Sequence, residues 1–313
     1  MLRPGQRPGI PGSGPTQTYC EAKKTLVVRV RKVKGFASCK PSAHYQLPLA
    51  SSCPGLCEYC YLHTRFGPRP YVTVYANVEE ILDEAARLVR EREPEVTAFE
   101  GSATSDPLAV EHITGSLRRS IEFFGAMEHA RFRFVTKFAD VAPILGARHA
   151  WRTTVRFSVN AASVIRSYEH HTAGLARRLE ALLQVRQDGY PVGVMIGPVI
   201  IFDAWKDEYR DLLASLAEVL NAPPEKDGRP DPETARLPFE IITHRFTSRA
   251  KSCILSVFPG TGLPMEEESR KLAYGQFGYT KFVYPKETMD EVREFFVSEL
   301  GRRLPAARIE YVV

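Results

Sequence analysis

Short apolar runs typical of β-strands alternate with stretches of helical periodicity between residues 71 and 243. In the first unit, a predicted strand over 71–75 precedes a helix whose apolar residues from 78 to 89 recur at spacings of three and four. About six alternations of strand and helix predict parallel strands joined by crossover helices, and hence an α/β fold with a partial (β/α)6 barrel. The later strands are predicted at 96–99, 131–135, 153–157, 191–196 and 239–243, and the later helices at 108–124, 175–186 and 205–220, with a short one near residue 141.

The N-terminal end of the chain departs from this pattern. Residues 1–19 are rich in Pro and Gly and poor in large apolar groups, so they cannot offset their ordering entropy and are expected to be disordered. We expect residues 20–313 to form one domain that begins with a strand over 25–30. A surface loop is predicted for the Pro-rich, charged residues 221–233.

The C-terminal region interleaves Gly, aromatic residues and a lysine over 274–284, which predicts a β-hairpin with exposed aromatic residues at its tip. Such a hairpin suits two roles: it can cover the mouth of the barrel, or its aromatic and cationic side chains can stack on nucleobases. A helix over 287–300 and a strand over 308–312 are expected to close the chain.

Composition narrows the class of protein. The 313 residues are 44% hydrophobic and 25% charged, which is an ordinary globular balance with enough apolar material for a large core. The net charge of +5 permits an anionic partner without requiring one. The sequence contains no apolar run of membrane-spanning length and no signal-peptide core at its N-terminus, so we expect no membrane association and a cytoplasmic location.

Three of the six cysteines, Cys53, Cys57 and Cys60, fall in one short loop with the spacing C-x3-C-x2-C. Three thiolates can hold three irons of a [4Fe–4S] cluster and leave the fourth iron open to a small molecule. A structural zinc site would need a fourth ligand, and His63 lies too close for the usual paired spacing. Disulfides are rare in the cytosol. The spacing therefore favours an iron–sulfur cluster.

Polar and small residues follow five of the predicted strands. Because the active sites of β/α barrels lie at the C-terminal ends of the strands, we expect these residues to face the cluster. One polar strand end is usually a turn or a helix cap, but five together favour a binding site, in which His244 carries the least weight. The residues are Glu100, Gly101, Ser102, Ala103, Thr104, Ser105, Asp106, Thr136, Lys137, Ser158, Val159, Asn160, Gly197, Pro198, His244 and Arg245.

These features resemble the spore photoproduct lyases, a family of radical S-adenosylmethionine (SAM) enzymes. The cysteine spacing before a β/α barrel is the signature of radical SAM enzymes in general, and the closer similarity extends from about Cys20 to Val313. It is carried by Lys24-Thr-Leu-Val-Val28, Lys40-Pro-Ser-Ala43, Glu58-Tyr-Cys-Tyr-Leu62, Thr104-Ser-Asp106, Ile121-Glu-Phe-Phe-Gly125, Arg133-Phe-Val-Thr-Lys137, His244-Arg-Phe-Thr247 and Lys281-Phe-Val-Tyr284.

The resemblance implies a radical SAM barrel with a C-terminal hairpin, a [4Fe–4S] cluster and SAM as cofactors, and a carbon–carbon lyase activity that repairs DNA. In this family, one electron from the reduced cluster cleaves SAM to a 5′-deoxyadenosyl radical. That radical takes hydrogen from C6 of a methylene-bridged thymine dimer, the bridging bond breaks, and the resulting thymine radical needs a hydrogen atom back. The cofactors supply the radical chemistry, while the protein supplies position and a dry pocket.

Roles for individual residues follow from the resemblance at matching positions. Cys53, Cys57 and Cys60 are expected to hold the cluster, and Tyr59 and Tyr61 to return the radical to the cofactor. The residues expected to contact SAM are Tyr59, Ser105, Lys137, Ser158, Asn160 and Gly197. Those expected to meet the lesion from the hairpin are Gln276, Phe277 and Lys281.

Two positions depart from the family pattern. The family's hydrogen donor is a cysteine in the run Phe-Glu-x-x-Cys-Thr-Ser-Asp, and this chain has Ala103 there, whose methyl group cannot donate that hydrogen readily. Gln276 and Phe277 replace an arginine and a tyrosine, so a charge-assisted phosphate contact is lost while the aromatic wedge survives.

Ala103 admits three hypotheses. The enzyme opens the lesion but ends in trapped side products, or another thiol, Cys39 or Cys253, reaches the site, or the chain is a paralogue that acts on another substrate. The expected partners are DNA that carries a thymine-dimer lesion and an electron donor such as a flavodoxin, a ferredoxin or a reductase, and a monomer is the default. A non-catalytic, metal-stapled nucleic-acid-binding protein is the alternative from another class.

Overall fold

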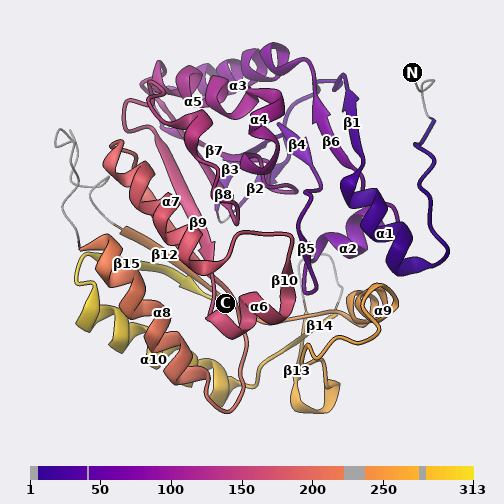
Figure 1. Cartoon of the computed structure of the whole chain (residues 1–313). Helices are drawn as coiled ribbons and strands as arrows, with labels where there is room; N and C mark the ends of the chain where they lie inside the picture. Colours follow the sequence, from indigo (N-terminus) through magenta and orange to yellow (C-terminus); the bar gives the residue numbers. More distant parts are fainter. Residues whose placement is uncertain (1–5, 41, 222–236, 275–279) are drawn as a thin grey trace.

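The computed structural model describes residues 6–40, 42–221, 237–274 and 280–313, and an eight-stranded sheet lies at its centre (Figure 1). The strand order is β15-β12-β11-β9-β8-β7-β3-β2, and all neighbours are parallel except β2 and β3. The order ends at β2 and β15, so the barrel described is open. Its strands are β2 (Ser38–Cys39), β3 (Ala43–Leu47), β7 (Thr97–Gly101), β8 (Ala130–Thr136), β9 (Thr153–Val159), β11 (Val192–Val199), β12 (Leu237–Thr243) and β15 (Ala307–Val312).

Helices cover the outer face of this sheet and bury its apolar side chains. On β8 the burial alternates, so Phe132 and Phe134 are buried against the helices while Arg133 lies on the opposite, inner face. The ring of Phe124 from α5 stacks on Phe132 at 5.0 Å, which joins helix and sheet. The main covering helices are α3 (Val78–Arg92), α5 (Ser116–Gly125), α7 (Leu175–Gln187), α8 (Trp205–Leu220) and α10 (Lys286–Arg303).

One predicted barrel strand lies elsewhere. The run at 71–75 forms β6 (Val72–Tyr75), which pairs with β1 (Leu26–Arg29) and β4 (Ala50–Ser51) in a separate three-stranded sheet. The first parallel strand of the barrel is instead β3, which precedes the cysteine loop. Its burial is weakly patterned, with polar side chains in its middle, and for that reason hydrophobic periodicity did not reveal it. The fold class is confirmed, but its first strand comes from another part of the chain.

The helix predicted over 108–124 is broken in the structure. A 3-10 turn (Leu108–Val110) and α4 (Glu111–Thr114) come first, and α5 begins after Gly115, whose φ of 62° is left-handed and favours glycine. The carboxylate of Glu111 accepts hydrogen bonds of 2.8 Å from the N–H groups of Leu117 and Arg118. An acidic side chain thus caps the new helix start.

Part of the tail expected to be disordered is helical. Helix α1 (Pro15–Lys24) begins with a proline in its first turn and buries Tyr19 and Lys23. The boundary predicted at residue 19 is therefore wrong, since the folded part begins at residue 15 or earlier. The pattern also missed α2 (Leu62–Phe66), β5 (Leu56–Cys57), α6 (Ala162–Tyr168), β10 (Glu169–His170) and α9 (Ser248–Val257).

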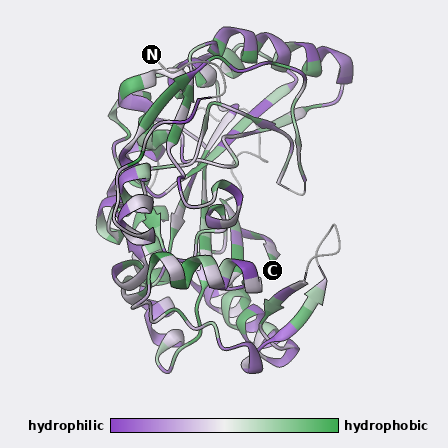
Figure 2. Ribbon diagram, turned by 90° about the vertical axis from the view of Figure 1, so that its right-hand side faces the viewer, coloured by the Kyte–Doolittle hydropathy of each residue, from purple (hydrophilic) through white to green (hydrophobic). Residues whose placement is uncertain are grey.

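The C-terminal hairpin is present, with β13 (Lys271–Tyr274) antiparallel to β14 (Thr280–Val283). Figure 2 shows it projecting from the lower part of the molecule. Arg270 anchors its base, because its guanidinium lies 3.7 Å from the ring centroid of Tyr284 and donates to the carbonyl of His244 at 2.8 Å. Gln276 and Phe277 lie outside the described residues, as does most of the predicted surface loop at 221–233.

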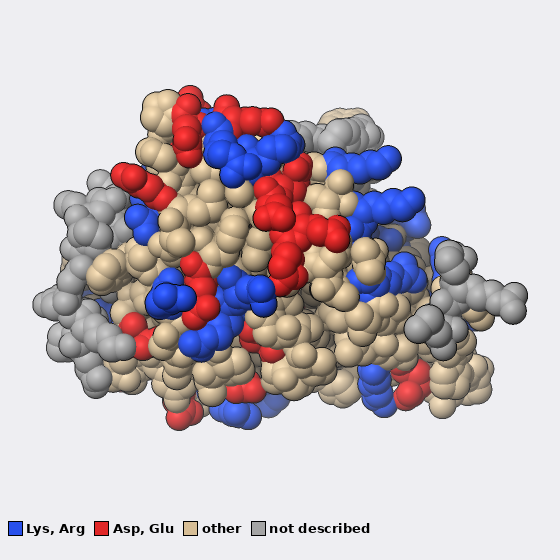
Figure 3. Space-filling model, turned by 90° about the horizontal axis from the view of Figure 1, so that it is seen from above, with Lys and Arg blue, Asp and Glu red and all other residues tan. Residues whose placement is uncertain are grey.

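Basic side chains with few acidic neighbours lie on one side of the molecule. In the view from above, several Lys and Arg lie on the right-hand side, where Figure 1 places β1, while Lys and Arg elsewhere on this face are mixed with Asp and Glu (Figure 3). Arg29, Lys32 and Lys34 are exposed there, and Arg31 lies 5.5 Å from the ring centroid of Tyr75. In the described part of the chain, no helix combines the length and apolarity needed to span a membrane.

Candidate radical SAM site

The three cysteines lie together in the loop between β4 and α2, at the carboxyl edge of β3. All three are free thiols; Cys57 is buried, and Cys53 and Cys60 are half-buried. Cys57 pairs with Glu169 where β5 and β10 form a short antiparallel ladder. Burial raises the pKa of the Cys53 thiol to about 11, against the opposing charge of Lys23, and it also raises that of Cys57. Metal binding would therefore release protons from these thiols.

The loop after β7 forms hydrogen bonds with the segment that carries the cysteines. Ser102, with a left-handed φ of 52°, accepts hydrogen bonds from the N–H groups of Leu49 (3.2 Å) and Ala50 (3.0 Å) through its hydroxyl. The hydroxyl of Ser105 donates to the carbonyl of Ser52, whose own N–H donates to Thr104 at 2.8 Å. Ser105, expected from the sequence, is thus at the edge of the loop that carries the cysteines.

Lys137 and Tyr59 meet at a buried carboxylate. The Lys137 ammonium lies 2.9 Å from the Tyr59 hydroxyl and 2.8 Å from Glu169, and Tyr59 also donates to Glu169. The fully buried Arg178 donates to the other oxygen of Glu169 at 2.5 Å. Although burial acts to raise the pKa of Glu169, the charges of Lys137 and Arg178 hold it below its ordinary value. One fixed anion therefore positions two residues that the sequence had singled out.

Three further predicted residues lie on or just beyond β9 and β11. Ser158 is buried and lies two positions after Arg156 on β9, so it shares the inner face with Arg156. Asn160 is buried just beyond the end of β9, and its side chain points towards helix α8. The Asn160 amide donates to the carbonyl of Pro198 at 2.7 Å and accepts from the Tyr209 hydroxyl at 2.7 Å. Gly197 packs against β12, where an added Cβ would lie 3.1 Å from that of Ile242.

Below these residues, charged side chains fill the inside of the barrel. Arg156 lies 2.7 Å from Glu240 and also pairs with Glu100, and Arg133 lies 3.0 Å from each of the same two carboxylates. Arg156 and Glu240 are each about 1% exposed. We call these four side chains the inner charge cluster. The sequence pointed to Glu100 alone, as a strand-end residue, because apolar periodicity does not reveal a charge paired across strands.

Tyr61 lies beside the position of the missing donor. The residue is 62% exposed, and its hydroxyl donates a 2.6 Å hydrogen bond to the carbonyl of Ala103. Desolvation of that hydroxyl, together with the thiols of Cys60 and Cys39, raises its pKa. Cys39 on β2 also lies close to the inner charge cluster, and burial together with Glu100 raises the pKa of its thiol to about 11.

The structure also places three other residues that were considered from the sequence: His63, His244 and Lys281. Burial lowers the pKa of His63 to about 4, and its Nε2 faces the carbonyls of Cys57 (3.1 Å) and Glu58 (3.0 Å). Burial and then Arg270 lower the pKa of His244 to about 3, so it is a neutral packing residue. Lys281 is on β14 opposite Ala273, half-buried. Among described residues, no group of three His, Cys, Asp or Glu converges as a site for a single metal ion.

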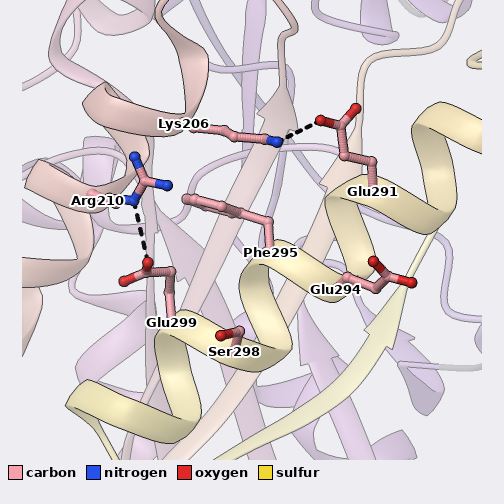
Figure 4. A pocket seen from close by; sticks show the side chains of 7 residues that line it. All are labelled: Lys206, Arg210, Glu291, Glu294, Phe295, Ser298 and Glu299. Carbon is pink, nitrogen blue, oxygen red and sulfur yellow. Dashed lines mark hydrogen bonds and ion pairs between the residues drawn. The ribbon is translucent and has the colours of Figure 1, made fainter.

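Two surface hollows differ in their relation to this site. One lies between α8 and α10, where Lys206 pairs with Glu291 at 2.5 Å and Arg210 with Glu299 at 3.2 Å (Figure 4). Its charged groups pair with one another on the outer helical layer, so it has no part in the site. The other, of about 370 Å³, is lined in part by Phe138 and Thr172, which also flank the cysteine loop at Gly55.

A three-cysteine loop at the carboxyl edge of an open β/α barrel defines the radical SAM class. The spore photoproduct lyase family model matches residues 5–313. The chain is 46% identical to the spore photoproduct lyase of Clostridium acetobutylicum over 309 residues (99% of this chain, 88% of that protein) and 43% identical to that of Bacillus subtilis over 302 residues (96% and 86%). The chain therefore belongs to the spore photoproduct lyase family.

Solved structures agree with this assignment. A spore photoproduct lyase double mutant with bound AdoMet and dinucleoside spore photoproduct matches with a TM-score of 0.92 and 40% identity, over 98% of this chain and 88% of that one. A spore photoproduct lyase complexed with dinucleoside spore photoproduct matches equally well, at 39% identity over the same shares of the two chains. Both carry the fold described above.

Proposed function

We propose that this chain is a radical SAM enzyme that reverses the spore photoproduct, 5-thyminyl-5,6-dihydrothymine, to two thymines in DNA. The observation that carries the proposal is the conjunction of the three-cysteine loop with Lys137 and Ser105 at one edge of the barrel. The family membership supports the substrate, because a relative of the same fold binds both AdoMet and the dinucleoside lesion.

The cysteine loop fits a [4Fe–4S] cluster. Three free thiols in one loop are the donor set for three irons, and each thiolate of such a cluster binds a different iron, so the three need not converge on one point. Cys53, Cys57 and Cys60 would hold the cluster, which when reduced supplies the electron that cleaves SAM. A flavodoxin, a ferredoxin or a reductase would deliver that electron.

SAM would bind along the strand ends. Its amino acid group carries a carboxylate, and Lys137 is the cation already held at that edge by Glu169. Ser105, Ser158 and Tyr59 would contact the cofactor, and Asn160 and Gly197 would shape the surface on which it lies. The hairpin residues Gln276, Phe277 and Lys281 would meet the lesion.

Cys39 is the thiol that we propose returns the hydrogen atom in place of the family's cysteine at position 103. Only the protonated thiol can give a hydrogen atom, and a pKa of about 11 keeps Cys39 protonated at neutral pH. Cys39 is also on β2, which pairs with β3, the strand that precedes the cysteine loop. In this step the S–H bond of Cys39 breaks as a C–H bond forms on the thymine methylene. Tyr61 then returns a hydrogen atom to sulfur, and Tyr59 and Tyr61 pass the radical on to the cofactor.

Ala103 also favours a second candidate, a paralogue that carries out the same hydrogen abstraction on another substrate. Reduced, reconstituted protein with SAM and a dinucleotide spore photoproduct separates the two. We expect dithymidine in excess over 5′-deoxyadenosine, because return of the radical to the cofactor re-forms SAM, and we expect neither product from a Cys57→Ala variant. Deoxyadenosine formed at one slow rate with or without the lesion would contradict the lyase proposal and favour the paralogue.

A further inference from the structure

Helix α1 packs directly over the cysteine loop. The ring of Tyr19, which is 1% exposed, lies 5.0 Å from that of His63, whose Nε2 contacts the carbonyl of Cys57. Tyr19 also packs in one small apolar cluster with Leu56 of the loop. One turn later, the ammonium of Lys23 donates to the carbonyl of Cys53 at 2.9 Å. Two polar side chains of α1 thus reach the loop from one side.

The hydroxyl of Tyr19 is a buried donor without a partner. Its oxygen is inaccessible to solvent, and no hydrogen-bond partner exists among the described residues. The ring that carries it packs against Leu56, the residue directly before Cys57 in the loop. Because a buried donor is costly when unsatisfied, such a group in a native protein calls for an acceptor.

Lys23 is a buried cation without a carboxylate. Its side chain is 2% exposed, yet within the described residues its only polar contact is the uncharged carbonyl of Cys53. Its ammonium lies 5.7 Å from the ring centroid of Tyr19. An isolated buried charge is strongly unfavourable unless a counter-charge lies nearby. Lys23 contacts the backbone of Cys53, and the three thiols of this loop can become anionic together when they bind metal.

We propose that Tyr19 and Lys23 tune the cluster that the cysteine loop holds: the Tyr19 hydroxyl donates a hydrogen bond to one of its sulfurs, and the Lys23 ammonium is its counter-charge. This inference rests on the proposed function, since it requires the cluster. Both groups stabilise the more negative, reduced form, because the potential of an iron–sulfur cluster depends on nearby charge and on hydrogen bonds to sulfur. Tyr19 and Lys23 therefore act through the cluster, by favouring its one-electron-reduced state.

The test is the reduction potential of the reconstituted cluster, followed by electron paramagnetic resonance during a redox titration. At the wild-type midpoint, Lys23→Met is expected to lower the ratio of reduced to oxidised cluster at least tenfold, which corresponds to a shift of about 59 mV to lower potential. Tyr19→Phe is expected to lower it about threefold. The matched control is Lys24→Met on the same helix, since Lys24 is exposed and pairs with Glu21.

Unchanged potentials in both variants, with four irons bound, would overturn the inference. Wild-type protein that takes up no iron–sulfur cluster would instead refute the proposed function on which it rests. If Lys23→Met takes up no cluster, thermal unfolding of the apoprotein shows whether Lys23 acts as a counter-charge or has a structural role. A melting temperature equal to or above that of wild-type apoprotein supports the counter-charge role, because an unpaired buried cation has been removed. A lower one would show a structural role for Lys23 and overturn the inference.

Discussion

The phenolic hydroxyl of Tyr61 donates a 2.6 Å hydrogen bond to the backbone carbonyl of Ala103. The tyrosine expected to relay the radical is therefore held beside the residue at which the family has its donor cysteine. Because the acceptor is a backbone atom, the contact does not depend on the side chain at position 103. A thiol introduced there would lie next to Tyr61.

This contact predicts that the two thiol positions can substitute for one another. Cys39→Ala should lose clean dithymidine while still forming 5′-deoxyadenosine, and adding Ala103→Cys should restore most of the dithymidine, because the new thiol is on the residue that Tyr61 contacts. Product analysis by mass spectrometry checks this. A Cys253→Ala variant is the control and should behave as wild type. Clean product from Cys39→Ala alone would exclude Cys39 as the donor.

Lys137→Met should weaken SAM binding about 10- to 100-fold, since a hydrogen bond to a charged group contributes about 1.5–3 kcal/mol. The fold should survive, because Arg178 still pairs with Glu169. Isothermal titration of the reconstituted protein with SAM measures the change. Lys206→Met is a suitable control, because Lys206 pairs with Glu291 on the outer layer. Equal affinity in both variants would remove Lys137 from the cofactor site.

Asp106 gives a pH dependence of known sign. Burial raises its pKa from 3.8 to about 6, although Thr136 and the N–H of Lys137 bond its carboxylate. The pKa of Asp106 is higher in the folded protein than in the unfolded chain. Its protonated form therefore contributes fully to folding stability below pH 3.8, and this contribution is lost as pH rises through 6. Asp106→Asn should therefore gain stability relative to wild type over this interval, by up to about 3 kcal/mol. Chemical unfolding of the apoproteins at pH 4 and pH 7 measures it, and a pH-independent difference would contradict it.

The inner charge cluster should be sensitive to the loss of one member. Arg156→Met leaves Glu100 and Glu240 with Arg133 alone, and breaking a buried ion pair in this way costs about 3–5 kcal/mol. The urea midpoint should fall clearly. Arg87→Met, which removes exposed pairs with Glu84 and Glu91, should leave the midpoint within error. Equal midpoints for the two variants would show that the cluster adds no stability.

Much of the architecture follows from hydrophobic periodicity, because the barrel repeats one unit. The helix predicted over 205–220 matches α8 at both ends, since its apolar stripe is long and regular. The strand β6 was misplaced because its apolar residues fit any sheet; only pairing with β1 and β4 shows which sheet it joins. Helix α1 was missed because Pro and Gly dominate its surroundings, while tertiary burial of Tyr19 stabilises it.

Site residues were predicted from the sequence where polar residues follow strands. Ser105, Lys137 and Ser158 were named in this way, and their contact with SAM stays a prediction. Glu169 and Arg178 were not, because the ion pair that holds Lys137 joins residues 32 positions apart in sequence. Nor was the place of Cys39 on β2, which folds back on β3 at the edge of the sheet. Such contacts form only when the barrel is folded, and no local pattern in the sequence indicates them.

The most direct test is to follow the transfer of hydrogen from the Cys39 thiol to the thymine radical. Reduced, reconstituted protein, SAM and dinucleotide spore photoproduct would react in D2O, where the Cys39 thiol exchanges its hydrogen for deuterium. Mass spectrometry would then compare wild type with Cys39→Ala. The account predicts dithymidine with one added deuterium from wild type and none of this product from the variant. Dithymidine without deuterium from wild type, or the same deuterated product from both proteins, would contradict it.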